Sequence, residues 1–289
     1  MQSAKIAIIG GSGVYSIEDR QNPSDFASSQ NSTNSADLKN VEEVSVETPF
    51  GPPSDKIILG EFSGKKIAFL SRHGRGHIFP PHLVNYRANI YALKKLGVER
   101  IFAVNACGSL REDFTPGEIV IVDQFIDRTK SRASTFFDGK NKSEEFSGVC
   151  HISVAEPFCA GLRKKLISAA EKLNIPHKKS GTYICIEGPR FSTRAESKMF
   201  QKMGADIIGM TMFPEIVLAR EMGICYASVA LNTDYDCWDE SRPPVSNQEV
   251  LRTMKENVSK AKKLIFSVIP ELPEERVCNC SRARENAMM

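Results

Sequence analysis

The sequence predicts a single α/β domain, and three observations support this prediction. Apolar, β-branched runs that are typical of strands alternate along the chain with segments of helical periodicity. Most of these runs lead directly into a loop of glycine or hydroxyl residues, as Lys5–Ile9 leads into Gly10-Gly11-Ser12-Gly13. The run Gly223–Leu231 carries no charged residue, which is typical of a strand buried on both faces of a sheet.

The first half of the chain predicts several strands and one long helix. After the strand Lys5–Ile9, the patterns of alternating and apolar residues predict strands over 56–59, 65–70, 101–104 and 118–122. The two runs 56–59 and 65–70 have the spacing of a strand pair. Leu83–Leu96 has helical periodicity and stops at Gly97, a residue that commonly ends helices.

The second half continues the alternation of helices and strands. Helices are predicted over 160–173, where Asn174-Ile175-Pro176 ends the pattern, from about Pro214 to Gly223, and over 250–269. Strands are predicted over 182–186, 205–209 and 223–231. This order favours a sheet with helices on its faces.

Length and composition limit the class of protein. The chain has 289 residues and a net charge of +3, with basic residues scattered along it. This excludes an evident electrostatic surface for nucleic acid or a membrane. No apolar run is long enough to span a bilayer, and the start of the chain lacks the pattern of a signal peptide. We expect a cytoplasmic protein, and the nucleus is left open as a second location.

We find no internal repeat and no clear domain boundary, so one domain is expected over 1–272. It contains a polar, low-complexity insertion at about 21–40, and a polar tail follows over 273–289. In that tail, Cys278 and Cys280 could form a tight disulfide or bind a metal. Because no histidine or second cysteine pair stands near them in the sequence, we expect no metal site and a dispensable tail.

Two loops that follow strands offer contacts for an anion. Backbone N–H groups of Gly10-Gly11-Ser12-Gly13 can approach a phosphate, with the Ser12 hydroxyl as a further donor. A dinucleotide site is disfavoured because Ser16 stands where its third glycine is required. Arg72 and His73 beside Gly74 form the second candidate contact. A tight turn and a basic surface loop remain the alternatives. Asn105–Leu110 reads as a third loop of small residues in the same position.

Asp234 and Asp236 follow the buried strand at its carboxyl end. In open α/β sheets this edge is where ligands bind, so both carboxylates are expected to face a small molecule. Capping of a helix or stabilisation of a turn is the alternative. Phe191, beside glycine and proline, could stack on a flat ring or belong to the core. Anion contacts, an apolar surface and carboxylates together suit a nucleoside and a phosphate.

A series of motifs runs in order from about residue 5 to 265. They are Gly10–Gly13, Thr48–Gly51, Arg72–Gly74, Asn85–Ile90, Ala106–Leu110, Asp123–Thr129, Glu187–Ser192, Met210-Thr211 and Thr233–Trp238. The series resembles the S-methyl-5′-thioadenosine phosphorylase family, a trimeric branch of the purine nucleoside phosphorylases. Only the 21–40 insertion and the tail fall outside it. The resemblance implies a central mixed β-sheet flanked by helices and phosphorolysis of an N-glycosidic bond.

The resemblance also implies roles for individual residues. Phosphate is held by Ser12, Arg72, His73, Asn105, Ala106 and Thr211. The nucleoside is bound by Phe191, Ser192, Met210, Asn247, Val250 and His151, the last of which reaches a neighbouring subunit's site in a homotrimer. The catalytic residues are Asp234 and Asp236, which bind N7 and the 6-amino edge of the purine. Our own hypothesis for the mechanism is that Asp234 donates a proton to N7 as the general acid while Asp236 accepts from the 6-amino group. The only partners implied are the nucleoside and inorganic phosphate, with no cofactor, no metal, no nucleic acid and no membrane.

The expected reaction converts S-methyl-5′-thioadenosine and phosphate into adenine and 5-methylthioribose 1-phosphate, a step of purine and methionine salvage. A broader purine nucleoside phosphorylase is the alternative. Asn247 stands where the family usually has an apolar residue, so adenosine is expected as a second substrate. Asn105 also replaces a hydroxyl residue common in the family. A dinucleotide-dependent oxidoreductase is disfavoured because the third glycine and a ribose-binding acid are missing. A non-catalytic purine-binding module is disfavoured by the set of anion contacts.

Overall fold

The computed structural model describes residues 3–10, 38–140, 144–241 and 247–289, and for 247–251 the backbone alone. Within these ranges one mixed sheet has the strand order β2-β3-β4-β1-β5-β10-β9-β7, with β11 paired to β5 and β6, and β6 to β8. The strands are β1 Ile6–Gly10, β2 Lys39–Val44, β3 Ile57–Phe62, β4 Lys65–Ser71, β5 Arg100–Ser109, β6 Ile119–Ile121, β7 Gln124–Arg128, β8 His177–Lys178, β9 Thr182–Ile186, β10 Ile207–Gly209 and β11 Cys225–Asp234. The expected mixed sheet is confirmed.

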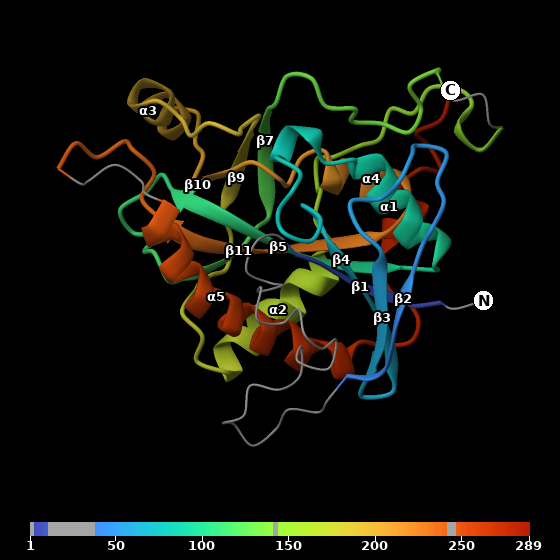
Figure 1. Cartoon of the computed structure of the whole chain (residues 1–289). Helices are drawn as coiled ribbons and strands as arrows, with labels where there is room; N and C mark the ends of the chain where they lie inside the picture. The colour runs from blue at the N-terminus through green and yellow to red at the C-terminus, as the bar shows by residue number, and fades with distance from the viewer. Residues whose placement is uncertain (1–2, 11–37, 141–143, 242–246) are drawn as a thin grey trace.

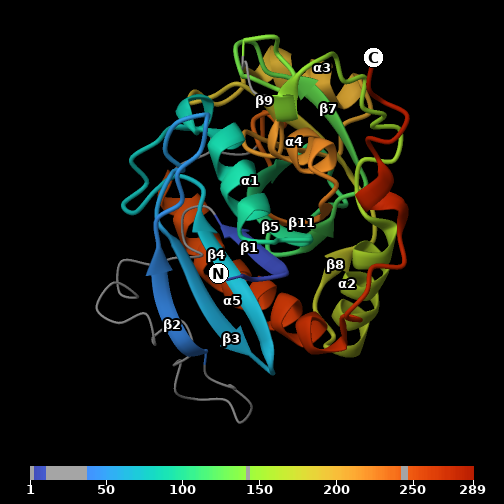
Figure 2. The same ribbon diagram turned by 90° about the vertical axis from the view of Figure 1, so that its right-hand side faces the viewer.

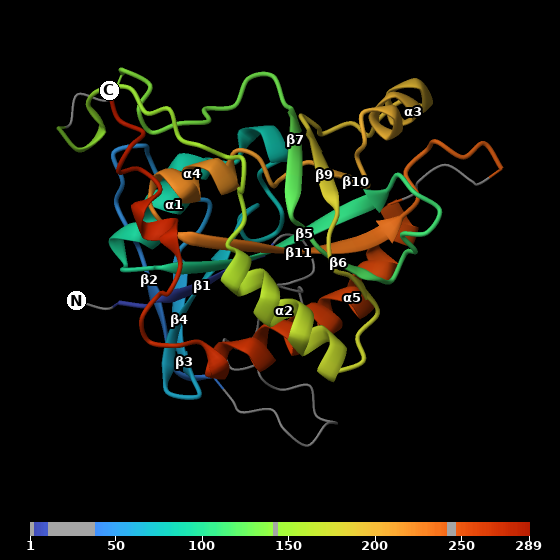
Figure 3. The ribbon, with the colours of Figure 1, turned by 180° about the vertical axis from the view of Figure 1, so that it is seen from behind.

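Helices cover both faces of the sheet. They are α1 Tyr86–Lys95, α2 Ala160–Lys172, α3 Arg194–Lys202, α4 Glu215–Glu221 and α5 Asn247–Val268. Helices α1 and α4 lie on one face of the long strands β5 and β11, and α2 and α5 lie on the other (Figures 1 and 3). Alternating residues of β1 divide between the two layers. Ala7 and Ile9 join the core cluster under α1 and α4, whereas Ile6 and Ile8 join the cluster with α2 and α5.

Strand β5 differs from its prediction. The stretch Asn105–Ser109 was expected to be a loop because its residues are small, but it continues the strand. Strand β11 pairs with β5 in parallel from Arg100 to Gly108 and supplies the hydrogen bonds that hold this stretch extended. Long-range pairing has therefore overridden the local preference of small residues for a turn. The carboxyl end of β11 also extends to Asp234, with a register shift between Asn232 and Asp234.

The tail is part of the domain. The Arg276 guanidinium donates to the carbonyl of Gly223 at 2.6 Å, and the His151 N–H donates to the carbonyl of Ala287 at 2.7 Å. The Met289 N–H donates to the carbonyl of Val149 at 2.9 Å. The tail thus packs on the rest of the chain, while its dispensability stays a prediction. No helix in the described ranges is both long enough and apolar enough to cross a bilayer.

Candidate active site

The site lies where β5 changes partner on one of its edges. Over Arg100–Ala103 that edge pairs with β1 in parallel, and at Gly108 and Ser109 it pairs with β10 antiparallel. Between these two pairings Ala106 is exposed, although every other residue of β5 is buried. An open point where strand partners diverge is where α/β sheets bind ligands. Ala106, an expected phosphate contact, therefore faces an opening at the centre of the sheet.

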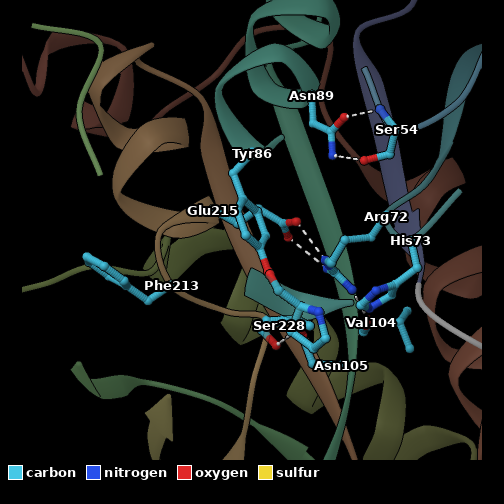
Figure 4. Close-up of polar contacts among 12 residues, drawn as sticks. Ser54, Arg72, His73, Tyr86, Asn89, Val104, Asn105, Phe213, Glu215 and Ser228 are labelled. Carbon is cyan, nitrogen blue, oxygen red and sulfur yellow. Dashed lines mark hydrogen bonds and ion pairs between the residues drawn. The ribbon is translucent and has the colours of Figure 1, made fainter. Parts of the chain in front are cut away.

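Arg72 is 1% exposed and forms a bidentate ion pair with Glu215, which is 0% exposed. Nε and Nη2 of Arg72 donate to the two carboxylate oxygens at 2.7 Å each, and Nη1 donates to the carbonyl of Val104 at 2.9 Å. Figure 4 shows the paired side chains. Burial alone would lower the pKa of Arg72, but the charge of Glu215 raises it, so the guanidinium stays charged. Each Nη has one further N–H that these hydrogen bonds do not use.

The Glu215 carboxylate is fixed by a second donor. The hydroxyl of Tyr226 on β11 donates to its Oε1 at 2.9 Å. Arg72 follows β4, Glu215 begins α4 and Tyr226 lies on β11, so the pair connects three elements of the site. The sequence analysis identified Arg72 but missed Glu215. The available signal was an acid beside the apolar run Ile216–Ala219, which we interpreted only as a helix start.

His73 is buried next to Arg72 as a neutral imidazole. Its Nδ1 lies 2.8 Å from the carbonyl oxygen of Phe79 and must donate to it, and its ring stacks on His77 with centroids 4.2 Å apart. Burial, together with the charge of Arg72, lowers the pKa of His73 from 6.5 to about 3. At neutral pH its Nε2 therefore carries a lone pair, which can accept a hydrogen bond from a protonated phosphate oxygen.

The neutral state of His73 predicts a specific acid sensitivity. Between pH 6.5 and about 3 the unfolded chain binds a proton at His73 that the folded chain does not. Stability contributed by this residue is therefore present near neutral pH and falls as the pH falls through that window. We expect the urea midpoint of the wild type to decrease more between pH 7 and about 4.5 than that of His73→Asn. The same substitution at His177 of β8 is the control. An unchanged pH slope in His73→Asn would contradict a buried neutral imidazole.

Asn105, which directly precedes Ala106 on β5, forms a hydrogen-bonded pair with Thr211. The Asn105 amide donates to Thr211 Oγ1 at 2.8 Å and accepts from the Ser228 hydroxyl at 2.9 Å. Thr211 Oγ1 accepts from Asn105, and the Thr211 side chain also hydrogen-bonds with the buried Tyr183 hydroxyl. Asn105 is 1% exposed, so its amide faces away from solvent and orients the Thr211 hydroxyl. Arg72 thus contacts β5 at Val104, and Thr211 contacts it at Asn105, the two residues that precede Ala106.

The two expected carboxylates lie at the end of β11. Asp234 accepts from the Thr233 hydroxyl at 2.7 Å and from the backbone N–H of Asp236 at 2.8 Å. Asp236 has a positive φ of 48°, a left-handed conformation that aspartate tolerates and that is common in turns. The Ser192 hydroxyl lies 2.8 and 2.7 Å from the two oxygens of Asp236. The two carboxylates therefore lie next to each other at the end of β11. The turn that we gave as the alternative interpretation is present as well.

Glycine at position 108 is required by the position of Asp234. A Cβ on Gly108 would lie 2.6 Å from Asp234 Oδ1 and 3.3 Å from the backbone nitrogen of Asp236. Any side chain on this residue of β5 would displace the carboxylate. The glycine thus lets Asp234 pack directly on the strand whose Asn105 orients Thr211.

Phe191 and Met210 supply apolar surface near the same edge. Phe191 is 47% exposed, and Met210 is half-buried. A Cβ on Gly188 would lie 2.7 Å from the Met210 sulfur, so the Glu187–Ser192 loop packs closely on Met210. Arg132 fixes this packing by donating to the carbonyls of Met210 and Glu187, each at 2.7 Å. Arg132 was also missed, because it stands in a polar segment without periodicity.

The remaining expected site residues lie outside this group. His151 is exposed beside the tail. Ser12 falls outside the described residues, and so do the side chains of Asn247 and Val250. In the described part of the chain, the candidate site therefore consists of the buried polar groups around Arg72 and Thr211, which are the expected phosphate contacts, and of the carboxylates of Asp234 and Asp236.

Known proteins are similar to this chain in sequence and fold over all or nearly all of their length. Residues 5–270 match the phosphorylase superfamily. The S-methyl-5′-thioadenosine phosphorylase of Thermofilum pendens is 52% identical, with 100% of each chain covered. A crystal structure of a methylthioadenosine phosphorylase from an antarctic soil metagenomic library superimposes with a TM-score of 0.85 at 43% identity, covering 100% of this chain and 93% of the other.

A third similar protein carries a nucleoside. A variant adenosine/methylthioadenosine phosphorylase of Schistosoma mansoni, crystallised with methylthioadenosine, is 37% identical with a TM-score of 0.83, covering 98% of this chain and 96% of the other. The family match spans residues 5–270, and the relatives are covered over nearly all of their length. The chain belongs to the S-methyl-5′-thioadenosine phosphorylase family of the phosphorylase superfamily.

Proposed function

We propose that the protein catalyses phosphorolysis of S-methyl-5′-thioadenosine to adenine and 5-methylthioribose 1-phosphate. One observation carries the proposal. A single strand, β5, orients the anion-binding hydroxyl of Thr211 through Asn105 and seats the Asp234 carboxylate on Gly108. A nucleoside bound at the carboxyl end of β11 would direct its base at the carboxylates and its sugar at the anion. The activity of the full-length relatives supports the same reaction.

The reaction breaks the bond between C1′ of the sugar and N9 of the purine. As the bond lengthens, positive charge develops on the sugar, and a phosphate dianion next to C1′ stabilises it before attacking. Arg72 and Thr211 supply donors for that phosphate, and inorganic phosphate is the co-substrate. Burial holds His73 neutral, so its Nε2 accepts a hydrogen bond from a phosphate O–H. A neutral imidazole carries no positive charge that would offset the negative charge with which phosphate stabilises the sugar.

The purine leaves with negative charge that is drawn toward N7. Asp234 transfers a proton to N7, which makes adenine a neutral leaving group. Asp236 accepts from the 6-amino group, and Ser192 holds its carboxylate in place. A 6-oxo purine would direct a lone pair at Asp236, so adenine nucleosides are favoured over inosine. Phe191 borders the base, and Met210 lies against the ribose.

Adenosine is the second proposed substrate. The amide of Asn247 would hydrogen-bond a 5′-hydroxyl where an apolar residue would favour a methylthio group. Val250 of the same helix would complete this pocket, and Ser12 would complete the phosphate site. We also propose a homotrimer in which His151 reaches the neighbouring subunit's site. The cytoplasmic location stays a prediction.

Release of the free base tests the reaction directly. Methylthioadenosine, adenosine and inosine are each incubated with the enzyme, with and without phosphate. We expect adenine from methylthioadenosine only when phosphate is present, a lower but measurable rate with adenosine, and the lowest rate with inosine. In Asn247→Val the kcat/KM for adenosine should fall relative to that for methylthioadenosine. Inosine as the best substrate would indicate the broader purine nucleoside phosphorylase instead.

A further inference from the structure

Four cysteines from distant parts of the chain meet on the face of the sheet opposite α1 and α4. Cys159 precedes α2, Cys225 begins β11, and Cys278 and Cys280 lie in the tail, which runs past the start of both elements (Figure 2). Their four sulfur atoms all lie within 4.8 Å of one another. The sequence analysis disfavoured a metal site because no second cysteine pair stands near the tail in the sequence. The fold supplies that pair as Cys159 and Cys225, which lie 53 or more positions before the tail cysteines in the sequence.

The spacing of the sulfurs suits four ligands around one ion. In a tetrahedral zinc site with Zn–S bonds of about 2.3 Å, neighbouring sulfurs lie about 3.8 Å apart. The Cys225 and Cys278 sulfurs are 3.2 Å apart, and the others lie within 4.8 Å. The tetrahedral value therefore lies between the one short distance and the upper limit for all pairs. A disulfide would need two sulfurs at about 2.0 Å.

The surroundings hold the four thiols in place. Cys159 and Cys225 are buried in the core cluster that includes α2 and α5, and both tail cysteines pack against that cluster. The backbone N–H of Cys159 donates to the carbonyl of Tyr226 at 2.9 Å, which ties the start of α2 to β11. On the tail side, Arg276 binds the Gly223 carbonyl, and a Cβ on Gly223 would lie 3.1 Å from the Ser281 carbonyl oxygen. The tail is thus seated closely on both sides of its two cysteines.

The chemistry of the set is selective. Four thiolates without histidine or carboxylate form a soft donor set, which favours zinc over magnesium or calcium. Cys159 also stands at the N-terminus of the 13-residue helix α2, whose partial positive charge stabilises a thiolate. All four positions are occupied by protein, so no coordination position remains for water or substrate. Such a closed site is structural.

We propose that Cys159, Cys225, Cys278 and Cys280 bind one structural Zn²⁺ ion that fixes the C-terminal tail to α2 and β11. Binding replaces the thiol protons with the metal ion, and no electron is transferred. The site is separate from the proposed phosphorolysis reaction, so its presence or absence does not depend on the substrate.

Metal analysis of the full-length protein tests this proposal. The chain is expressed with zinc in the medium, purified without chelators, and analysed by inductively coupled plasma mass spectrometry. We expect one zinc per chain, released by a mercurial and detected with a chromogenic chelator. After denaturation with a chelator and without reductant, all eight cysteines should react with a thiol reagent. Cobalt grown into the protein should give the visible bands and the thiolate charge-transfer band of a tetrahedral site.

Variants locate the ion. Cys278→Ser alters a half-buried residue of the tail and should lose the zinc and lower the thermal midpoint, whereas Cys150→Ser, outside the cluster, should retain the zinc. Wild-type protein with no zinc would overturn the proposal whether all eight thiols react or only four. The second pattern would show that the cluster forms two disulfides. Zinc retained at full stoichiometry by both Cys278→Ser and Cys225→Ser would place the metal elsewhere and also overturn it.

Discussion

Asp234→Asn is expected to lower kcat/KM for methylthioadenosine by about 10²–10⁴-fold, the usual contribution of a general acid. Asparagine keeps the size of the side chain and an oxygen that can accept from the Thr233 hydroxyl or the Asp236 N–H. It can donate a hydrogen bond to N7 but cannot transfer a proton. The departing purine must then leave with most of its negative charge. Steady-state adenine release at saturating phosphate measures the effect.

Two matched variants separate proton transfer from base positioning. Asp236→Asn should act mainly on the contrast between adenine and hypoxanthine nucleosides, because an amide can donate to a 6-oxo group. Ser192→Ala removes the hydroxyl that holds Asp236 and should change KM more than kcat. If Asp234→Asn retains the wild-type rate, the assignment of the acid is wrong. A loss in Asp236→Asn equal to that in Asp234→Asn would show that the two carboxylates act as one unit.

Glu215→Gln is expected to destabilise the protein by about 3–5 kcal/mol, the typical cost of removing one partner of a buried ion pair. The amide leaves the Arg72 guanidinium charged and buried without a counter-charge. It also changes an acceptor that Tyr226 uses. Urea unfolding at fixed protein concentration measures the change, since assembly also contributes to apparent stability.

A second glutamate of the same helix provides the control. Glu221 is also buried, but its carboxylate accepts from neutral donors, the Thr135 hydroxyl and the Phe136 N–H. Burial raises the pKa of Glu221, so loss of its charge is less costly. Glu221→Gln should therefore cost clearly less than Glu215→Gln. Equal costs would mean that the Arg72 ion pair does not dominate the stability of this site.

Local pattern was sufficient for elements whose residues interact mainly with their neighbours in sequence. The strand over Thr182–Ile186 was predicted at its observed bounds, and Ala160–Leu173 differs from α2 by one residue at its end. In both, the apolar periodicity and the residues that end the element agree with the fold. The positions of Arg72 and His73 after β4, and of Asp234 at the end of β11, follow from the same pattern.

Other features depended on contacts between distant residues. Asn105–Ser109 reads as a loop by composition, yet β11 and β10 hold it as a strand. Glu215 meets Arg72 across 143 positions of sequence, and nothing beside either residue indicates the pairing. Arg132 likewise joins two motifs from a segment whose sequence carries no periodic signal.

By itself, the sequence determined the α/β class, most element positions and the chemical types at the strand ends, because these depend on periodicity and on residue identity. The tertiary structure alone decided the opening at Ala106, the buried partner of Arg72, the neutral state of His73 and the meeting of four cysteines. Each of these depends on which distant segments exclude water from one another. Burial and the resulting shifts in pKa arise only when those segments pack together.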